Sequence, residues 1–97
     1  MATRVCTAYM TWGRHTFTAN VRAESAFEAA LLALQSFANC GRPLNDRTGN
    51  VEIIWGDRRV RVRVPNAFDW LERPSKTQEE EARKKRLKAL VVRRYMK

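Results

Sequence analysis

A run of basic side chains near the C-terminus carries the strongest chemical signal in this sequence. Residues 82–97 hold eight Lys and Arg and no Asp or Glu, whereas the first 81 residues have a net charge of only +1. This density matches the electrostatic footprint of a segment that binds the phosphates of DNA or RNA. A solvated, charged helix face gives the same pattern and is the alternative interpretation. The candidate phosphate-binding residues of this run are Arg83, Lys84, Lys85, Arg86 and Lys88.

A second basic feature is a strand in which arginines alternate with valines. Arg59, Arg61 and Arg63 are spaced by two, so they project from one face of a β-strand. The matching face of the preceding hairpin would offer Tyr9, Arg22 and several hydroxyl side chains. Arginines beside an exposed aromatic ring could follow a phosphate backbone and stack a base. Alternatively, the arginines only protect an exposed strand from aggregation.

Catalytic chemistry finds little support among the remaining residues. His15 is the only histidine, and we find no Ser–His–Asp set, metal-ligand cluster or glycine-rich phosphate loop. Cys6 and Cys40 are too few for a disulfide framework and have no zinc-site spacing. Residues 79–81 are three glutamates that fit the start of a helix better than an acid/base pair. We predict a non-enzymatic binding protein without cofactor, metal or small-molecule substrate.

Protein–protein interaction is the second functional hypothesis. Residues 26–38 contain one charge, Glu28, and are too apolar for one side of a four-stranded sheet to cover. Either the C-terminal segment or another subunit would have to cover Leu32 or Ala29. The partner would be a second copy of the chain or an acidic protein. The candidate interface side chains are Leu32, Leu87, Leu90, Val91 and Tyr95.

Length and hydropathy limit the organisation and location of the chain. The 97 residues predict one domain, with a globular part over 1–74 and a basic C-terminal helix over 75–97, docked or projecting. No apolar run approaches the roughly 18 residues of a membrane span. The N-terminal residues lack the apolar stretch of a secretory signal. We therefore expect a cytoplasmic protein that does not bind membranes.

Two β-hairpins with two-residue loops are predicted by strict alternation of apolar and polar residues. The first loop, 13–14, pairs Trp12 with His15 and brings three apolar pairs onto one face. These pairs are Met10–Phe17, Ala8–Ala19 and Cys6–Val21. The second loop, 56–57, pairs Ile53 with Val60, Val51 with Val62, and Glu52 with Arg61 as a cross-strand ion pair. Glycine at the first position of each loop favours type II′ turns.

Helix signals follow each hairpin. Ser25 and Glu28 form a capping box before the helix at 26–38, which we expect to end at Gly41. A short helix is predicted from Asn66 to Leu71, and a longer one is capped by Ser75 or Thr77, the latter opening a second capping box at 77–80. The first half of this last helix is charged all round, so we expect it to bury nothing.

The fold class follows from this order of elements. We predict an α+β protein with a ββα-ββα pseudo-repeat: an antiparallel four-stranded sheet, made of two type II′ hairpins, on a central apolar helix. A long basic C-terminal helix completes the chain. The repeat is suggested by Trp12-Gly13 matching Trp55-Gly56 and by residues 25–28 matching 66–69.

Overall fold

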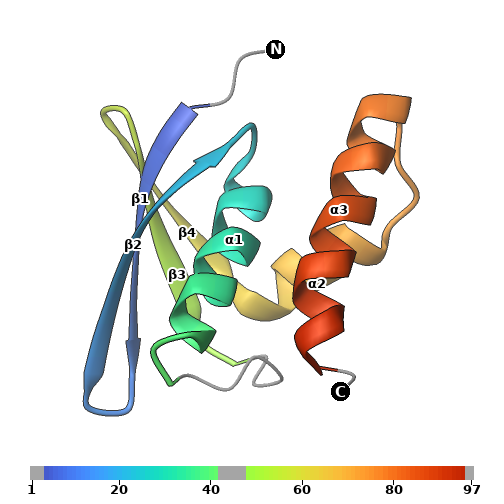
Figure 1. Ribbon diagram of the computed structural model, residues 1–97. Helices are drawn as coiled ribbons and strands as arrows, with labels where there is room; N and C mark the ends of the chain where they lie inside the picture. Colours follow the sequence, from blue (N-terminus) through green and yellow to red (C-terminus); the bar gives the residue numbers. More distant parts are fainter. Residues whose placement is uncertain (1–3, 42–47, 96–97) are drawn as a thin grey trace.

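One four-stranded sheet forms a layer with three helices on one of its sides (Figure 1). The computed structural model describes residues 4–41 and 48–95, and side chains as far as residue 89. The strands are β1 (Arg4–Trp12), β2 (His15–Ala23), β3 (Asn50–Trp55) and β4 (Arg58–Arg63), in the spatial order β2-β1-β3-β4. The helices are α1 (Ala26–Ala38), α2 (Val64–Glu72) and α3 (Gln78–Tyr95). The predicted α+β class with an antiparallel four-stranded sheet is confirmed.

Both hairpins have the predicted register. Met10 faces Phe17 and Ala8 faces Ala19 in the first hairpin, and Val51 faces Val62 in the second. Gly13 and Gly56 have φ of 62° and 65°, while no described residue other than glycine has a positive φ. A type I′ turn would need positive φ at both loop residues, whereas positive φ at the first loop residue alone has the sign pattern of a type II′ turn.

The two hairpins meet along a short contact between β1 and β3. Only three residue pairs join these strands, namely Thr7–Ile54, Ala8–Ile53 and Tyr9–Glu52. β1 continues as far as Trp12 and β3 begins at Asn50, so both strands extend beyond the paired segment at the same end. The sheet is therefore divided at this end, between its two central strands.

The hydrophobic core lies between the sheet and α1. Ile53 and Val51 from β3 and Phe37, Leu31 and Leu34 from α1 are among its largest fully buried side chains. As predicted, Ser25 caps α1: its Oγ accepts a hydrogen bond from the Glu28 backbone N–H at 3.1 Å. The second bond of the capping box differs, because the Glu28 carboxylate accepts from the backbone N–H of Glu24 and not from that of Ser25. Both α2 and α3 contact α1, in which Ala29 is buried and Leu32 is half-buried.

The start of α2 differs from the prediction. The helix begins at Val64, directly after β4, and Asn66 is an exposed residue of its first turn rather than its cap. Pro65 explains the difference, because its fixed φ suits the first turn of a helix, where its missing N–H is not needed. Val64 is fully buried and donates its N–H to the Gly49 carbonyl at 3.0 Å. The chain therefore turns from strand to helix two residues earlier than expected.

Candidate nucleic-acid interface

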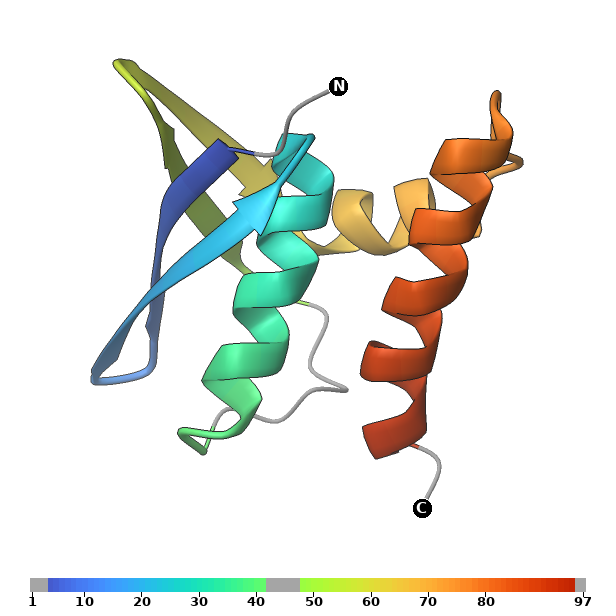
Figure 2. The same cartoon turned by 45° about the horizontal axis from the view of Figure 1, so that its top comes forward.

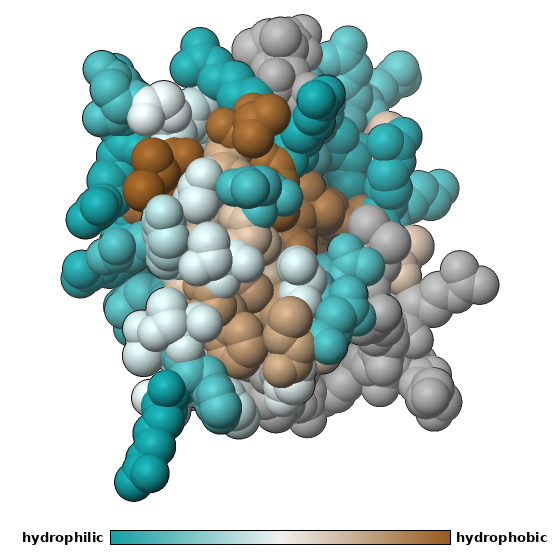
Figure 3. Space-filling model, turned by 60° about the vertical axis from the view of Figure 1, so that its left-hand side comes forward, coloured by the Kyte–Doolittle hydropathy of each residue, from teal (hydrophilic) through white to brown (hydrophobic). Residues whose placement is uncertain are grey.

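The face of the sheet opposite the helices is open (Figure 2). Strand alternation places Tyr9, Glu52 and Arg61 on this face, because their neighbours Ala8, Ile53 and Val62 point into the core. Figure 3 brings the sheet side forward and shows apolar and weakly polar side chains between hydrophilic margins. The other side chains assigned to this face are Val5, Thr7, Thr11, Thr16, Thr18, Asn20, Arg22, Asn50, Ile54, Arg59 and Arg63.

One row of side chains crosses three strands of the open face. Tyr9 on β1 lies opposite Glu52 on β3, and Glu52 lies opposite Arg61 on β4. The Arg61 Nη2 and Glu52 Oε1 atoms are 3.2 Å apart, which confirms the predicted cross-strand ion pair. Tyr9 is 37% exposed, so part of its ring is free for stacking. The structure thus brings together the aromatic and one arginine that the sequence marked as binding residues.

Two further arginines of β4 line the edge of the same face. Arg59 lies opposite Ile54 and Arg63 lies opposite Asn50, both without a carboxylate across the strand. No ion pair within the described part of the chain engages either guanidinium. Arg22 is also exposed, but it lies on β2 at the opposite edge of the sheet. The positive charge is therefore concentrated along β4.

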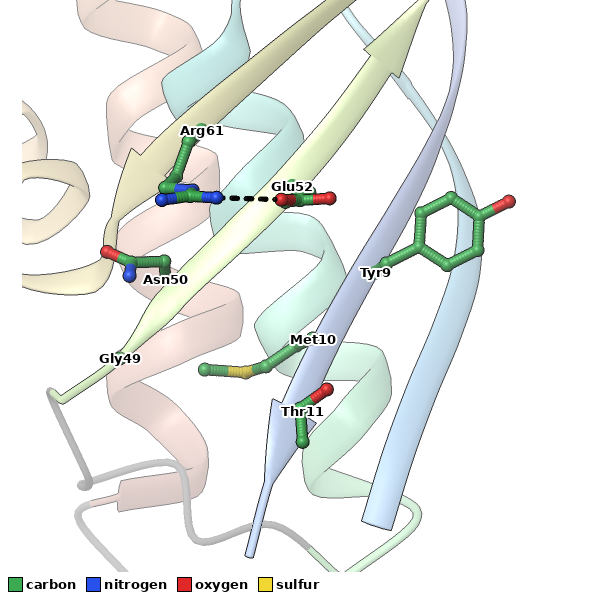
Figure 4. A pocket seen from close by; sticks show the side chains of 7 residues that line it. All are labelled: Tyr9, Met10, Thr11, Gly49, Asn50, Glu52 and Arg61. Atoms are coloured by element: carbon green, nitrogen blue, oxygen red, sulfur yellow. Dashed lines mark hydrogen bonds and ion pairs between the residues drawn. The ribbon is translucent and has the colours of Figure 1, made fainter.

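An open hollow occupies the division between β1 and β3 (Figure 4). Its volume is about 470 Å³, and Met10 and Gly49 approach closely beside it, since a Cβ on Gly49 would be 3.1 Å from the Met10 methyl. Gly49 also has a φ of 91°, which a larger residue would adopt only with strain. The residues lining the hollow are Tyr9, Met10, Thr11, Gly49, Asn50, Glu52 and Arg61. Polar hydroxyl, amide, carboxylate and guanidinium groups thus surround a space large enough for a nucleobase.

Arg83 on α3 is engaged inside the fold. Its Nη1 donates to both oxygens of Glu28 at 3.1 and 3.0 Å, and its Nη2 is 2.6 Å from Glu24 Oε1. Both carboxylates belong to the N-terminal end of α1 and the residues before it. We call this arrangement the Arg83 clamp. The guanidinium is thus already bound to two carboxylates.

Lys84 is likewise engaged, and it is only 4% exposed. Its Nζ donates to the Arg73 carbonyl at 2.9 Å, lies 3.2 Å from Glu80 and stands 5.0 Å from the centre of the Trp70 ring. Leu87, one turn further, is 3% exposed and belongs to the core. The expectation that the first half of this helix buries nothing is therefore wrong.

The other basic side chains that the structure describes on α3, as far as residue 89, are exposed and separate from the sheet face. Lys85, Arg86 and Lys88 are exposed, but α1 lies between α3 and the sheet (Figures 1 and 2). The two basic features of the sequence therefore form two surfaces rather than one. Of the candidate interface residues, Leu32 is half-buried, while the side chains of 90, 91 and 95 lie outside the described residues.

Other chemistry is sparse in the described ranges. No three His, Cys, Asp or Glu side chains of residues 4–41 and 48–89 come together as a possible metal site. Burial raises the pKa of the Cys6 thiol above its ordinary value, against the opposing effect of Arg4. Cys40 is exposed, and both cysteines are unpaired. No helix found in the described residues is long and apolar enough to span a membrane.

Comparison of the chain with protein-family models, curated proteins and solved structures gives no match. The geometry of the open face and of α3 therefore carries the functional argument alone.

Proposed function

We propose that the protein binds single-stranded nucleic acid on the open face of its sheet. Arg59 and Arg63 contact phosphates along β4, Arg61 adds its positive charge between them, and a base stacks on Tyr9. The observation that carries the proposal is the row in which an exposed aromatic and an arginine lie two strands apart on the uncovered face of one sheet. Single strands are favoured over duplexes because only unpaired bases can lay a free face on an aromatic ring.

The basic surface of α3 has a secondary part in this proposal. Lys85, Arg86 and Lys88 lie on the far side of α1 from the sheet. A short single-stranded oligonucleotide bound to the open face therefore does not reach them. Their charge raises the local concentration of a polyanion and speeds its encounter with the protein. Binding by this surface alone would follow charge and show little preference for unpaired bases.

The proposed ββα pseudo-repeat is supported by the pairing of the central strands. The alignment that places Trp12 on Trp55 also places Tyr9 on Glu52, and these two residues pair across β1 and β3. An approximate two-fold axis through this pair would exchange the hairpins. The halves differ in their helix starts, because Ser25 caps α1 whereas Asn66 lies inside α2. On this proposal, the row at the centre of the sheet is where the two units meet.

A salt-dependent titration tests the proposal. Labelled single-stranded and duplex oligonucleotides of equal length are titrated at two salt concentrations, with fluorescence anisotropy as the readout. We expect tighter binding of the single strand, weakening as salt rises, with a log–log slope of about −0.7 per phosphate contacted. Absence of binding to either nucleic acid at low salt would contradict the proposal.

Two matched triple variants locate the binding surface. Arg59, Arg61 and Arg63 are changed to alanine in one, and Lys85, Arg86 and Lys88 in the other, so both lose three positive charges. We expect the first variant to lose at least about tenfold more affinity than the second, since each charge-assisted contact contributes about 1.5–3 kcal/mol. The reverse ranking would assign binding to α3 instead.

Protein–protein interaction remains the second candidate because large apolar side chains are exposed on the sheet, one on a central strand and one on an edge strand. Val5 on β1 is 59% exposed and Val60 on β4 is 37% exposed. A homodimer or an acidic partner protein would cover them. Sedimentation over a wide concentration range checks the first possibility, and a dimer that Val5→Lys dissociates would favour this function over nucleic-acid binding.

A further inference from the structure

Glu52 is out of place on a surface that binds phosphates. It is the one acidic side chain on the open face within the described residues, and it lies in the middle of the row between Tyr9 and Arg61. A carboxylate repels phosphates, so phosphate binding alone gives it no role. The ion pair itself is weak support for the fold, because the Arg61 side chain is 67% exposed and the Glu52 side chain 34%.

The Glu52–Arg61 pair has free hydrogen-bonding groups on its exposed side. Arg61 Nη2 is bound to Glu52 Oε1, which leaves Glu52 Oε2 and further guanidinium N–H groups for a ligand. In Figure 4 the two side chains point toward one another at one side of the hollow, and Tyr9 lies on the other side of β1. The pair therefore presents acceptors and donors next to each other.

The spacing of the row suits one stacked base. Neighbouring strands of a sheet are about 4.8 Å apart, so Glu52 stands one strand and Arg61 two strands from Tyr9. A base lying flat on the Tyr9 ring would extend parallel to the sheet. Its hydrogen-bonding edge would then cross β1 and meet the pair, while the adjoining hollow lined by Thr11 and Asn50 leaves room for the neighbouring sugar.

We propose that the Glu52–Arg61 pair reads the edge of the base stacked on Tyr9 and selects guanine. This inference rests on the proposed function. Guanine presents two adjacent donors, N1–H and the N2 amino group, to a carboxylate, and its O6 acceptor lies beside them for the guanidinium. Uracil offers one N–H between two carbonyl oxygens, which a carboxylate repels. Adenine and cytosine each offer one donor, so they bind with intermediate affinity.

Four oligonucleotides test the selection. Each is a labelled ten-residue oligouridylate, with its central base unchanged or replaced by guanine, adenine or cytosine. We expect the guanine oligonucleotide to bind about tenfold more tightly than the all-uridine one, the lower range for a bidentate base contact. Equal affinity for all four overturns the inference but leaves the proposed function standing. No binding of any of them overturns the proposed function as well.

Glu52→Gln separates base reading from charge. We expect the guanine preference to fall to about twofold or less, while affinity for the all-uridine oligonucleotide stays the same or rises because a negative charge is removed. Glu81→Gln removes the same charge from an exposed position on α3 and should leave the preference intact. Glu52→Asp keeps the negative charge, but the shorter side chain moves the carboxylate away from the base. This variant should also weaken the guanine preference. A guanine preference that survives both Glu52 variants, with their folding verified by circular dichroism, overturns the inference.

Discussion

The Arg83 clamp gives the sharpest stability prediction. Arg83→Ala removes the guanidinium that lies between Glu24 and Glu28 and leaves two carboxylates facing one another. The Glu28 side chain is only 9% exposed, so water cannot fully replace the lost hydrogen bonds. Breaking a buried ion pair from one side costs about 3–5 kcal/mol. Arg83 itself is 30% exposed, so we expect a smaller loss, about 2 kcal/mol.

Chemical and thermal unfolding measure this loss. Urea denaturation followed by circular dichroism gives the free energy of unfolding, and a loss of about 2 kcal/mol corresponds to a Tm lower by roughly 8–16 °C for a domain of this size. Lys88→Ala is the matched control, since it removes an exposed cation from the same helix. If the two variants differ by less than about 0.5 kcal/mol, the clamp does not hold α3 in place.

The same variant tests the assignment of Arg83 to the fold. At a temperature where Arg83→Ala remains folded, its affinity for single-stranded nucleic acid should stay within about twofold of the wild type. Its guanidinium is already bound to Glu28 and Glu24, so it has little to offer a phosphate. A large loss of affinity together with an unchanged Tm would show that Arg83 serves the ligand rather than α3.

Smaller changes follow from turns, caps and thiols. Gly56→Ala should cost about 1 kcal/mol by urea denaturation, since a positive φ strains alanine even though no atom lies within 4 Å of its new Cβ. Thr77→Ala should lower the free energy of unfolding by about 1 kcal/mol in the same assay, because Thr77 Oγ1 accepts a hydrogen bond from the Glu80 backbone N–H at 3.1 Å. Iodoacetamide should modify Cys40 in the native protein and Cys6 only after denaturation, as mass spectrometry would show. Rapid native labelling of Cys6 would contradict its burial and its raised pKa.

Local signals explain why the hairpins could be predicted in detail. Each register follows from a two-residue loop and from apolar residues that must share one face, so no distant part of the chain is needed. The pairing of Tyr9 with Glu52 joins residues far apart in sequence, and no turn fixes it. The sequence therefore predicts Glu52 opposite Arg61 but not Tyr9 beside them. The hollow next to Gly49 depends on the same long-range pairing and was missed with it.

The errors at α2 and α3 have different physical causes. Asn66 resembles Ser25 in residue type, but Pro65 next to it has a restricted φ that fits an earlier helix start. The burial of charged side chains in the first half of α3 is not predicted, because hydrophobic periodicity detects apolar contacts, whereas Arg83 and Lys84 dock through hydrogen bonds. One signal was available in Glu28, the only charge in an apolar helix, because a buried carboxylate needs a partner.

The position of α3 also changes how the chain's charge should be weighed. Arg83 and Lys84 compensate Glu24, Glu28 and Glu80, so part of the basic run neutralises acids within the fold. Arg59 and Arg63 have no such partner in the described structure and lie on the face that also holds an exposed ring. Net charge alone therefore overstates α3 as a binding surface. The better candidate is the edge of the sheet, where Arg59 and Arg63 flank the Arg61–Glu52 pair.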